Sequence, residues 1–165
     1  MRALPVIDGR EVYGALIVRT DYGDEAAWRA VMAKLAQPWG PDGEYEAVAH
    51  VMDDPVWADA TPDEVAASAD DRLGAVFLAD GTTMREPDHA LLAVELRFGK
   101  PWGGKEGPNE WVALGRRFRT EPRMVHTIHA NLSIANMDFE EYAAAAGADP
   151  EGVLRPFRSS SRPGT

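Results

Sequence analysis

Two histidines, three residues apart, are the first candidates for chemistry in this chain. His126 and His129 lie in the stretch VHTIHANLSIANMDFEEYAAAA, residues 125–146. Imidazoles one helical turn apart can chelate zinc or transfer protons near neutral pH. A zinc site needs three or four ligands, and the spacing of His50 and His89 does not link them to this pair. We therefore predict no metal site, and two interpretations stay open: acid–base catalysis at a pocket rim, or half-exposed helix residues.

The helix that carries these histidines is predicted from the spacing of its apolar residues. At about 100° per residue, His129 lies on the flank of the apolar face and His126 points away from it. Asn131 falls near the other flank, where a partly buried amide needs hydrogen-bond partners, and it is a candidate for ligand or partner binding. The apolar face that we expect to meet the core consists of Met124, Ile128, Leu132 and Ala135, with Val125 at its edge.

A tight corner between two helices is predicted directly after the histidines. Asn136 suits the left-handed residue that ends a helix. Asp138 suits the N-cap of the next helix, with Glu141 three residues later as its reciprocal partner. Met137 and Tyr142 occupy the two positions of a hydrophobic staple. These residues therefore indicate architecture rather than a site.

Carboxylates follow the first three predicted strands. They are Asp21, Asp24, Asp53, Asp54 and Asp80. Ligands of open parallel sheets bind at the carboxyl ends of strands, and Mg²⁺ prefers oxygen ligands. Aspartate in a strand-to-helix loop is also a common helix cap. We favour capping, and we predict neither a metal nor another cofactor.

Tryptophans in Gly/Pro-rich turns are candidates for binding. Trp39 lies in a PWG turn, and Trp102 and Trp111 lie in the loop GKPWGGKEGPNEW, residues 99–111. Aromatic side chains on such loops can anchor a partner or cover a small molecule, and they can equally fold back over the sheet.

Arginines gather around the predicted hairpin of the last two strands. Arg97, Arg117 and Arg119, together with Arg116 and Arg123, form a positive cluster in an acidic chain. Guanidinium groups can bind a carboxylate or phosphate bidentately. Charged side chains on an edge strand also prevent aggregation, so ion pairing is the alternative interpretation.

Composition narrows the class of protein. The chain has 165 residues, 45% of them hydrophobic, a formal charge of −10 and no cysteine. The acidic charge argues against binding to nucleic-acid phosphates, and the lack of cysteine excludes disulfides and thiolate chemistry. The apolar runs are far shorter than a membrane span, and the first fourteen residues do not resemble a signal peptide. We expect a cytoplasmic protein that does not bind membranes.

Apolar runs and helix-capping residues predict an α/β fold. Strands and helices alternate in the first half of the chain, which is typical of parallel pairing through crossover helices. The long loop 99–111 favours antiparallel pairing of the last two strands, so we expect a mixed sheet of about five strands with an antiparallel edge hairpin. We predict one domain over 1–157 and a flexible tail over 158–165. The predicted strands are 14–20, 45–53, 74–80, 91–98 and 116–120, and the predicted helices are 24–37, 61–69, 121–135 and 138–146.

Four blocks of the chain carry a family resemblance. They read LIVRTDYGDEAAW, FLAD…DHALLAVEL, RRFRTEP and NLSIANMDFEEYA. Together they resemble an uncharacterised actinobacterial family of small single-domain proteins, a domain of unknown function, over about residues 14–157. The resemblance implies one compact cytoplasmic domain, and it implies no activity, cofactor or catalytic residue.

Two functions from different classes follow from these residues. The first is a binding protein for a protein partner, in an accessory or immunity-type role, or for a small ligand, with the tryptophan loops and the acidic surface as the binding face. The second is a cofactor-free enzyme that acts on a small anionic metabolite. In that enzyme His126 or His129 is the acid–base group and the arginines hold the substrate.

Overall fold

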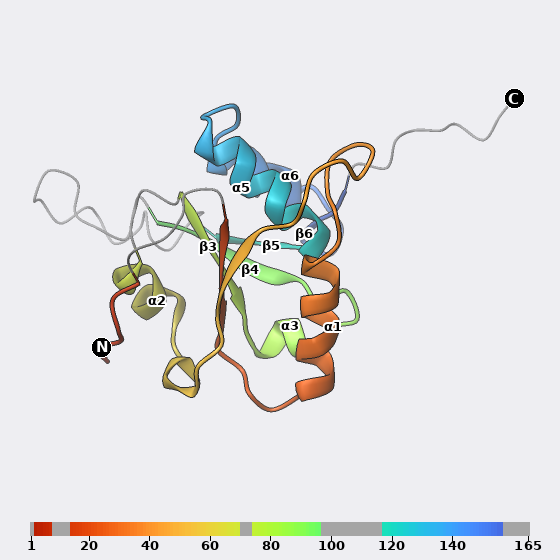
Figure 1. Ribbon diagram of the computed structural model, residues 1–165. Helices are drawn as coiled ribbons and strands as arrows, with labels where there is room; N and C mark the ends of the chain where they lie inside the picture. The colour runs from red at the N-terminus through yellow and green to blue at the C-terminus, as the bar shows by residue number, and fades with distance from the viewer. Residues whose placement is uncertain (1, 8–13, 70–73, 97–116, 157–165) are drawn as a thin grey trace, which may run out of the picture.

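A mixed β-sheet forms the centre of the molecule. The computed structural model describes residues 2–7, 14–69, 74–96 and 117–156 (Figure 1). The described residues form one six-stranded sheet with the strand order β2-β1-β3-β4-β5-β6. The strands are β1 (Ala15–Arg19), β2 (Ala49–Met52), β3 (Ala75–Ala79), β4 (Leu91–Glu95), β5 (Arg117–Thr120) and β6 (Val153–Leu154).

Helices cover both faces of this sheet, as Figure 1 shows. One face packs against α1, α5 and α6, and the other packs against α2 and the turn η1. The helical elements are α1 (Glu25–Leu35), η1 (Pro55–Trp57), α2 (Pro62–Ser68), α3 (Gly81–Arg85), η4 (Pro122–Met124), α5 (Val125–Ser133) and α6 (Phe139–Gly147).

The strand directions confirm the predicted α/β class. β1 is parallel to both β2 and β3, while β4 is antiparallel to both of its neighbours, β3 and β5. The sixth strand, β6, is an addition to the prediction, and it pairs in parallel with β5 after the C-terminal helix pair. A two-residue strand is too short to give an alternating pattern in the sequence, and the five-residue helix α3 is equally hard to detect.

Alternation along the strands divides the core into two apolar clusters. In β1, Ala15 and Ile17 pack toward α1, α5 and α6, whereas Leu16 and Val18 pack toward α2. All five residues of β1 are buried, as expected for a parallel strand covered on both faces. On α1, the predicted apolar face is confirmed, because the buried residues are Ala27, Trp28, Val31 and Leu35.

The predicted strand over 45–53 is too long at its beginning. Regular pairing with β1 starts at Ala49, and Tyr45 instead pairs with Trp39 in an antiparallel bridge. Between these two residues lie Gly40 and Gly43, with φ angles of 96° and 64°, a backbone conformation that glycine adopts without strain. Residues 39–45 therefore form a small turn-rich loop rather than part of the sheet.

The corner between α5 and α6 is confirmed, but its left-handed residue is Ala135 and not Asn136. Ala135 has a φ of 54°. The N–H of Asn136 donates to the Asn131 carbonyl at 2.9 Å, and the N–H of Ala135 donates to the Leu132 carbonyl at 3.2 Å, which together make a Schellman ending. Ala135 is exposed, so its predicted place on the core-facing side of the helix is wrong.

The start of α6 follows the prediction. Asp138 is the N-cap in an extended conformation, and its backbone N–H donates to the Glu141 carboxylate at 2.8 Å. Of the predicted staple, Tyr142 belongs to the core cluster and the partly buried Met137 packs against that cluster.

Four candidate side chains and the predicted tail lie outside the described residues. Arg97, Trp102, Trp111 and Arg116 fall within 97–116, and the tail, 158–165, falls within 157–165. In the part of the chain that the structure describes, no helix has the length and apolar character needed to span a bilayer.

Candidate functional site

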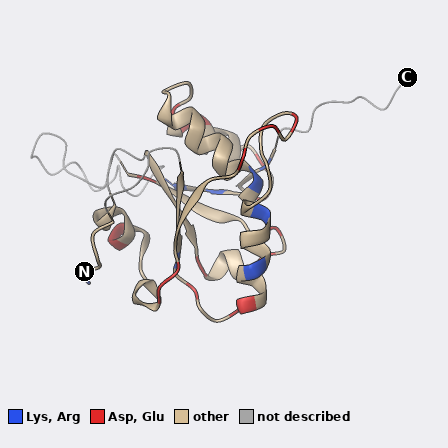
Figure 2. Ribbon diagram, in the orientation of Figure 1, with Lys and Arg blue, Asp and Glu red and all other residues tan. Residues whose placement is uncertain are grey.

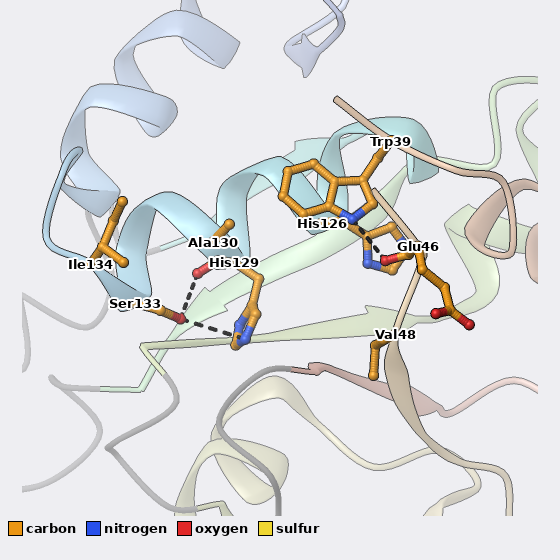
Figure 3. Close-up of a pocket in the computed structure, with 8 residues that line it drawn as sticks. All are labelled: Trp39, Glu46, Val48, His126, His129, Ala130, Ser133 and Ile134. Carbon is orange, nitrogen blue, oxygen red and sulfur yellow. Dashed lines mark hydrogen bonds between the residues drawn. The ribbon is translucent and has the colours of Figure 1, made fainter. Parts of the chain in front are cut away.

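A pocket of about 340 Å³ lies between α5 and the loop that joins α1 to β2 (Figure 3). Val48 stands directly before β2, and Gly74, directly before β3, faces Leu132 of α5. The pocket therefore lies at the amino ends of the parallel strands. The described residues that line it are Trp39, Glu46, Val48, His126, His129, Ala130, Ser133 and Ile134.

His126 joins α5 to the end of α1. Its side chain is 5% exposed, so the prediction that it points away from the core is wrong. The imidazole Nε2 lies 2.7 Å from the Leu35 carbonyl oxygen and must carry the hydrogen that it donates. Leu35 is the last residue of α1, where carbonyls have no partner within the helix. His126 thus satisfies one of these carbonyls.

Burial keeps His126 neutral. Removal from water lowers the pKa of this imidazole, and the hydrogen bond to Leu35 opposes this only in part. The ring is therefore uncharged near neutral pH. Because Nε2 carries the hydrogen, Nδ1 is the acceptor nitrogen.

His129 is buried one turn further along α5, with 4% of its surface exposed. Its Nε2 lies 3.5 Å from Ser133 Oγ, and that hydroxyl donates to the His129 carbonyl at 2.7 Å. The hydroxyl hydrogen is therefore directed at the backbone carbonyl. Both histidines are buried, and the interpretation of half-exposed helix residues is wrong for both.

Trp39 forms the wall of the pocket opposite α5. Its ring lies against Tyr45, with ring centroids 4.7 Å apart, and against His126, with centroids 6.3 Å apart. The indole N–H donates to the Glu46 carbonyl at 3.1 Å. In Figure 3 the indole lies beside the His126 ring, whereas the carboxylate of Glu46 is directed away from both imidazoles.

Exposed apolar side chains collect around this pocket. The described residues include five large apolar side chains that are exposed, and three of them are Tyr45, Val48 and Ile134, at 49%, 42% and 73%. Val48 and Ile134 line the pocket, and Tyr45 packs on Trp39. Contiguous exposed apolar surface is typical of binding sites.

The carboxyl ends of the parallel strands have a different character. Arg19, at the end of β1, is 2% exposed and bonds the carboxylates of Glu25 at 2.6 Å and Asp53 at 3.3 Å. Its guanidinium also lies over the rings of Tyr22 and Trp28, at 4.2 and 5.0 Å from their centroids. The sequence pattern predicts a strand that includes Arg19 but indicates no function for this side chain. The acidic residues that follow the strand are the signal that could have revealed this network.

A second ion pair stands beside the first. Arg119 of β5 binds both oxygens of Asp80, at 2.7 and 2.8 Å. Burial alone would raise the pKa of Asp80, but the hydrogen bonds and charge of Arg119 outweigh burial and hold this pKa below its ordinary value. Asp80 also accepts from the N–H of Thr83 and caps α3.

The other strand-end carboxylates make the local hydrogen bonds expected of caps and turns. Asp24 accepts from the N–H of Ala27, and Asp54 accepts from the N–H of Val56. Within the described ranges, no group of three or more histidine or acidic residues is placed to hold a metal ion. The hydrogen bonds of Asp24 and Asp54 agree with the preference for capping at these two positions.

The structure brings together three of the predicted site residues and separates three others. Trp39, His126 and His129 share the pocket. Arg117 pairs with Asp63, while Arg119 pairs with Asp80. The Asn131 amide donates to the Tyr142 hydroxyl at 2.6 Å and accepts from Asn136 at 3.2 Å, which fastens α5 to α6. None of these last three candidates is among the described residues that line the pocket.

Five lining residues were not anticipated. The sequence predicts a strand for Glu46 and Val48, and no sequence pattern marks Ala130 and Ser133 of α5 or Ile134 directly after it as pocket residues. One sequence feature could have indicated the pocket: Val48 and Ile134 are apolar residues with small or polar neighbours. The unanticipated residues are Glu46, Val48, Ala130, Ser133 and Ile134.

Comparison with known proteins defines the family of the chain. No curated protein and no solved structure matches the sequence. A family model matches residues 14–157, which is most of the chain. The pocket and both ion-pair networks lie inside that match. The chain belongs to the family described as a domain of unknown function, DUF6924.

Proposed function

We propose that this domain is a binding protein for a small molecule and that the histidine pocket is its binding site. The observation that carries the proposal is a pocket of about 340 Å³ with Val48 and Ile134 exposed at its margin. Ligand pockets of proteins have volumes of about 300–1,000 Å³, an apolar lining and a few polar groups. Here the polar groups are two buried imidazoles and the hydroxyl of Ser133.

The enzyme alternative has less support. It requires an arginine clamp beside a histidine, but Arg117 and Arg119 bind Asp63 and Asp80 and do not line the pocket. The hydroxyl of Ser133 donates to a backbone carbonyl, so its hydrogen is not shared with the imidazole of His129 as in a nucleophile–base pair. A binding role needs neither arrangement.

Filling the pocket tests the proposal. Ala130 lines the pocket and is partly exposed, so Ala130→Leu adds three carbons to the cavity with little change to the helix. The matched control is Ala144→Leu on the exposed side of α6. A panel of small aromatic and aliphatic compounds is screened against ¹⁵N-labelled protein by amide NMR shifts.

We expect the compounds that bind to shift the amides of α5 and of residues 39–48. Ala130→Leu should weaken these compounds by about tenfold or more, since a leucine occupies their space, and Ala144→Leu should leave them unchanged. Compounds that bind Ala130→Leu as well as the original protein would refute the proposed site.

A further inference from the structure

Three side-chain hydrogen-bond donors of the pocket are already engaged. The Trp39 N–H donates to the Glu46 carbonyl, and the His126 Nε2–H donates to the Leu35 carbonyl. The Ser133 hydroxyl donates to the His129 carbonyl. A bound anion needs donors or cations, and these three groups have none to spare.

The same side chains keep hydrogen-bond acceptors that a ligand could use. A neutral imidazole that donates through Nε2 keeps an acceptor at Nδ1, as in His126, and the oxygen of Ser133 keeps its lone pairs. The Trp39 indole adds a ring face, which attracts a cation more strongly than other aromatic faces. The pocket therefore suits a ligand that donates hydrogen bonds.

The charge around the pocket has the same preference. Among the described lining residues, Glu46 carries a carboxylate, burial favours the neutral form of His126, and none is Lys or Arg. The loop that supplies Trp39 also carries Asp42 and Glu44, and Figure 2 shows this loop marked by acidic residues. The chain as a whole has a formal charge of −10, which attracts cations over longer distances.

From these observations we infer that the pocket takes a small organic amine in its cationic form. The apolar body of the amine lies against Trp39, Val48 and Ile134, and its ammonium group lies on the side of the acidic loop. The inference rests on the proposed function and adds the chemical class of the ligand. An anionic ligand, expected from the arginines, would find no Lys or Arg among the described lining residues.

Three probes of one shape separate the charge classes: 2-phenylethylamine, 2-phenylethanol and 3-phenylpropionate. Their dissociation constants are measured at pH 7 by titration of the amide shifts. We expect the amine to bind about tenfold more tightly than the carboxylate, with the alcohol between them, because desolvated cation–π and carboxylate contacts favour only the amine.

Removing the loop charges provides the matched test. Glu44→Gln with Glu46→Gln should weaken the amine about threefold and leave the alcohol unchanged. The control removes two acidic charges elsewhere, Asp63→Asn on α2 with Glu86→Gln after α3, and should change neither probe.

The possible results distinguish the inference from the proposed function. If the carboxylate or the alcohol binds as tightly as the amine, and Ala130→Leu still blocks it, the charge class is wrong and the binding site stands. If none of the three probes shifts the pocket amides, or if Ala130→Leu binds them all equally, both the inference and the proposed function are refuted.

Discussion

The two ends of the parallel strands differ in how their polar groups are used. At the carboxyl ends, Arg19 and Arg119 face Glu25, Asp53 and Asp80 in short ion pairs. At the amino ends, the pocket has one exposed carboxylate, two buried imidazoles and apolar walls. General experience with open α/β sheets places ligands at the carboxyl ends, yet here those charged groups neutralise one another. Charged residues at the carboxyl ends of strands are therefore a weak guide to a binding site when their hydrogen bonds are already formed within the protein.

The opposite ends also differ in what their side chains contribute to stability. Partly buried ion pairs join the end of β1 to Asp53, directly after β2, and join β5 to Asp80, directly after β3. The histidine pocket is lined by a loop and one helix, and its walls include exposed apolar groups. Substitutions at the carboxyl ends should therefore change stability more than binding, and substitutions that fill the pocket should do the reverse.

The largest loss of stability is expected from Arg119→Met. The change removes both hydrogen bonds to Asp80 and leaves a carboxylate with a side chain only 24% exposed. Breaking a buried pair by removing one partner costs roughly 3–5 kcal/mol, and partial exposure places this pair near the lower figure, about 3 kcal/mol. Chemical denaturation measures the free energy of unfolding.

The control for this prediction is Arg117→Met on the same strand. Its partner Asp63 has a side chain that is 59% exposed, so the expected loss is about 0.5 kcal/mol or less. Binding of amines at the pocket should not change in either variant. Equal losses from the two variants would show that the Asp80 pair is no more important than a surface pair, and the contrast between the two ends would then be lost.

An intermediate effect is expected from His126→Ala, which tests the structural role of this pocket residue. The change leaves the Leu35 carbonyl without its partner and should cost about 2 kcal/mol at pH 7.5. Because burial lowers the pKa of His126 in the folded protein, the unfolded chain binds a proton first as the pH falls. The stability that the neutral imidazole contributes is present above its unfolded pKa of about 6.5 and is lost as the pH falls through the lower folded value.

The pH dependence separates this role from simple loss of packing. Free energies of unfolding are measured for both proteins at pH 7.5 and at pH 5. The difference between them should be smaller at pH 5, since only the original protein pays for a buried imidazole. A constant difference at the two pH values would mean that protonation of His126 does not oppose folding.

Local patterns allowed most of the fold to be predicted from the sequence. Short apolar runs located β1 and β3, and Thr61 with Glu64 marked the start of α2 through a capping box that the structure contains. These signals lie within a few residues of one another. Two elements of two to five residues, β6 and α3, were missed because so short a segment has no measurable period.

The pocket could not be predicted in the same way, because it joins parts of the chain that are far apart in sequence. The bond between His126 and the Leu35 carbonyl spans 91 positions. A helical projection places His126 away from the core because it includes only the residues of one helix, whereas the end of α1 and Trp39 cover that side. The two histidines and Trp39 were each identified as candidates, but their meeting depends on tertiary packing.

The smallest expected effect is a gain in stability from Ala135→Gly, at the corner that ends the pocket helix. Ala135 has a φ of 54°, where a Cβ atom meets the following carbonyl at a cost of roughly 1–2 kcal/mol, so glycine removes this strain. Glycine also makes the unfolded chain more flexible, which reduces the net gain to about 0.5–1 kcal/mol.

The control is the same substitution in the middle of a helix, Ala144→Gly in α6, which should instead cost about 1 kcal/mol. Thermal unfolding of the two variants should therefore move in opposite directions. Amine binding should stay the same in Ala135→Gly, because α5 supplies the pocket residues and the corner does not. A loss of binding in this variant would show that the pocket requires the original conformation of the corner.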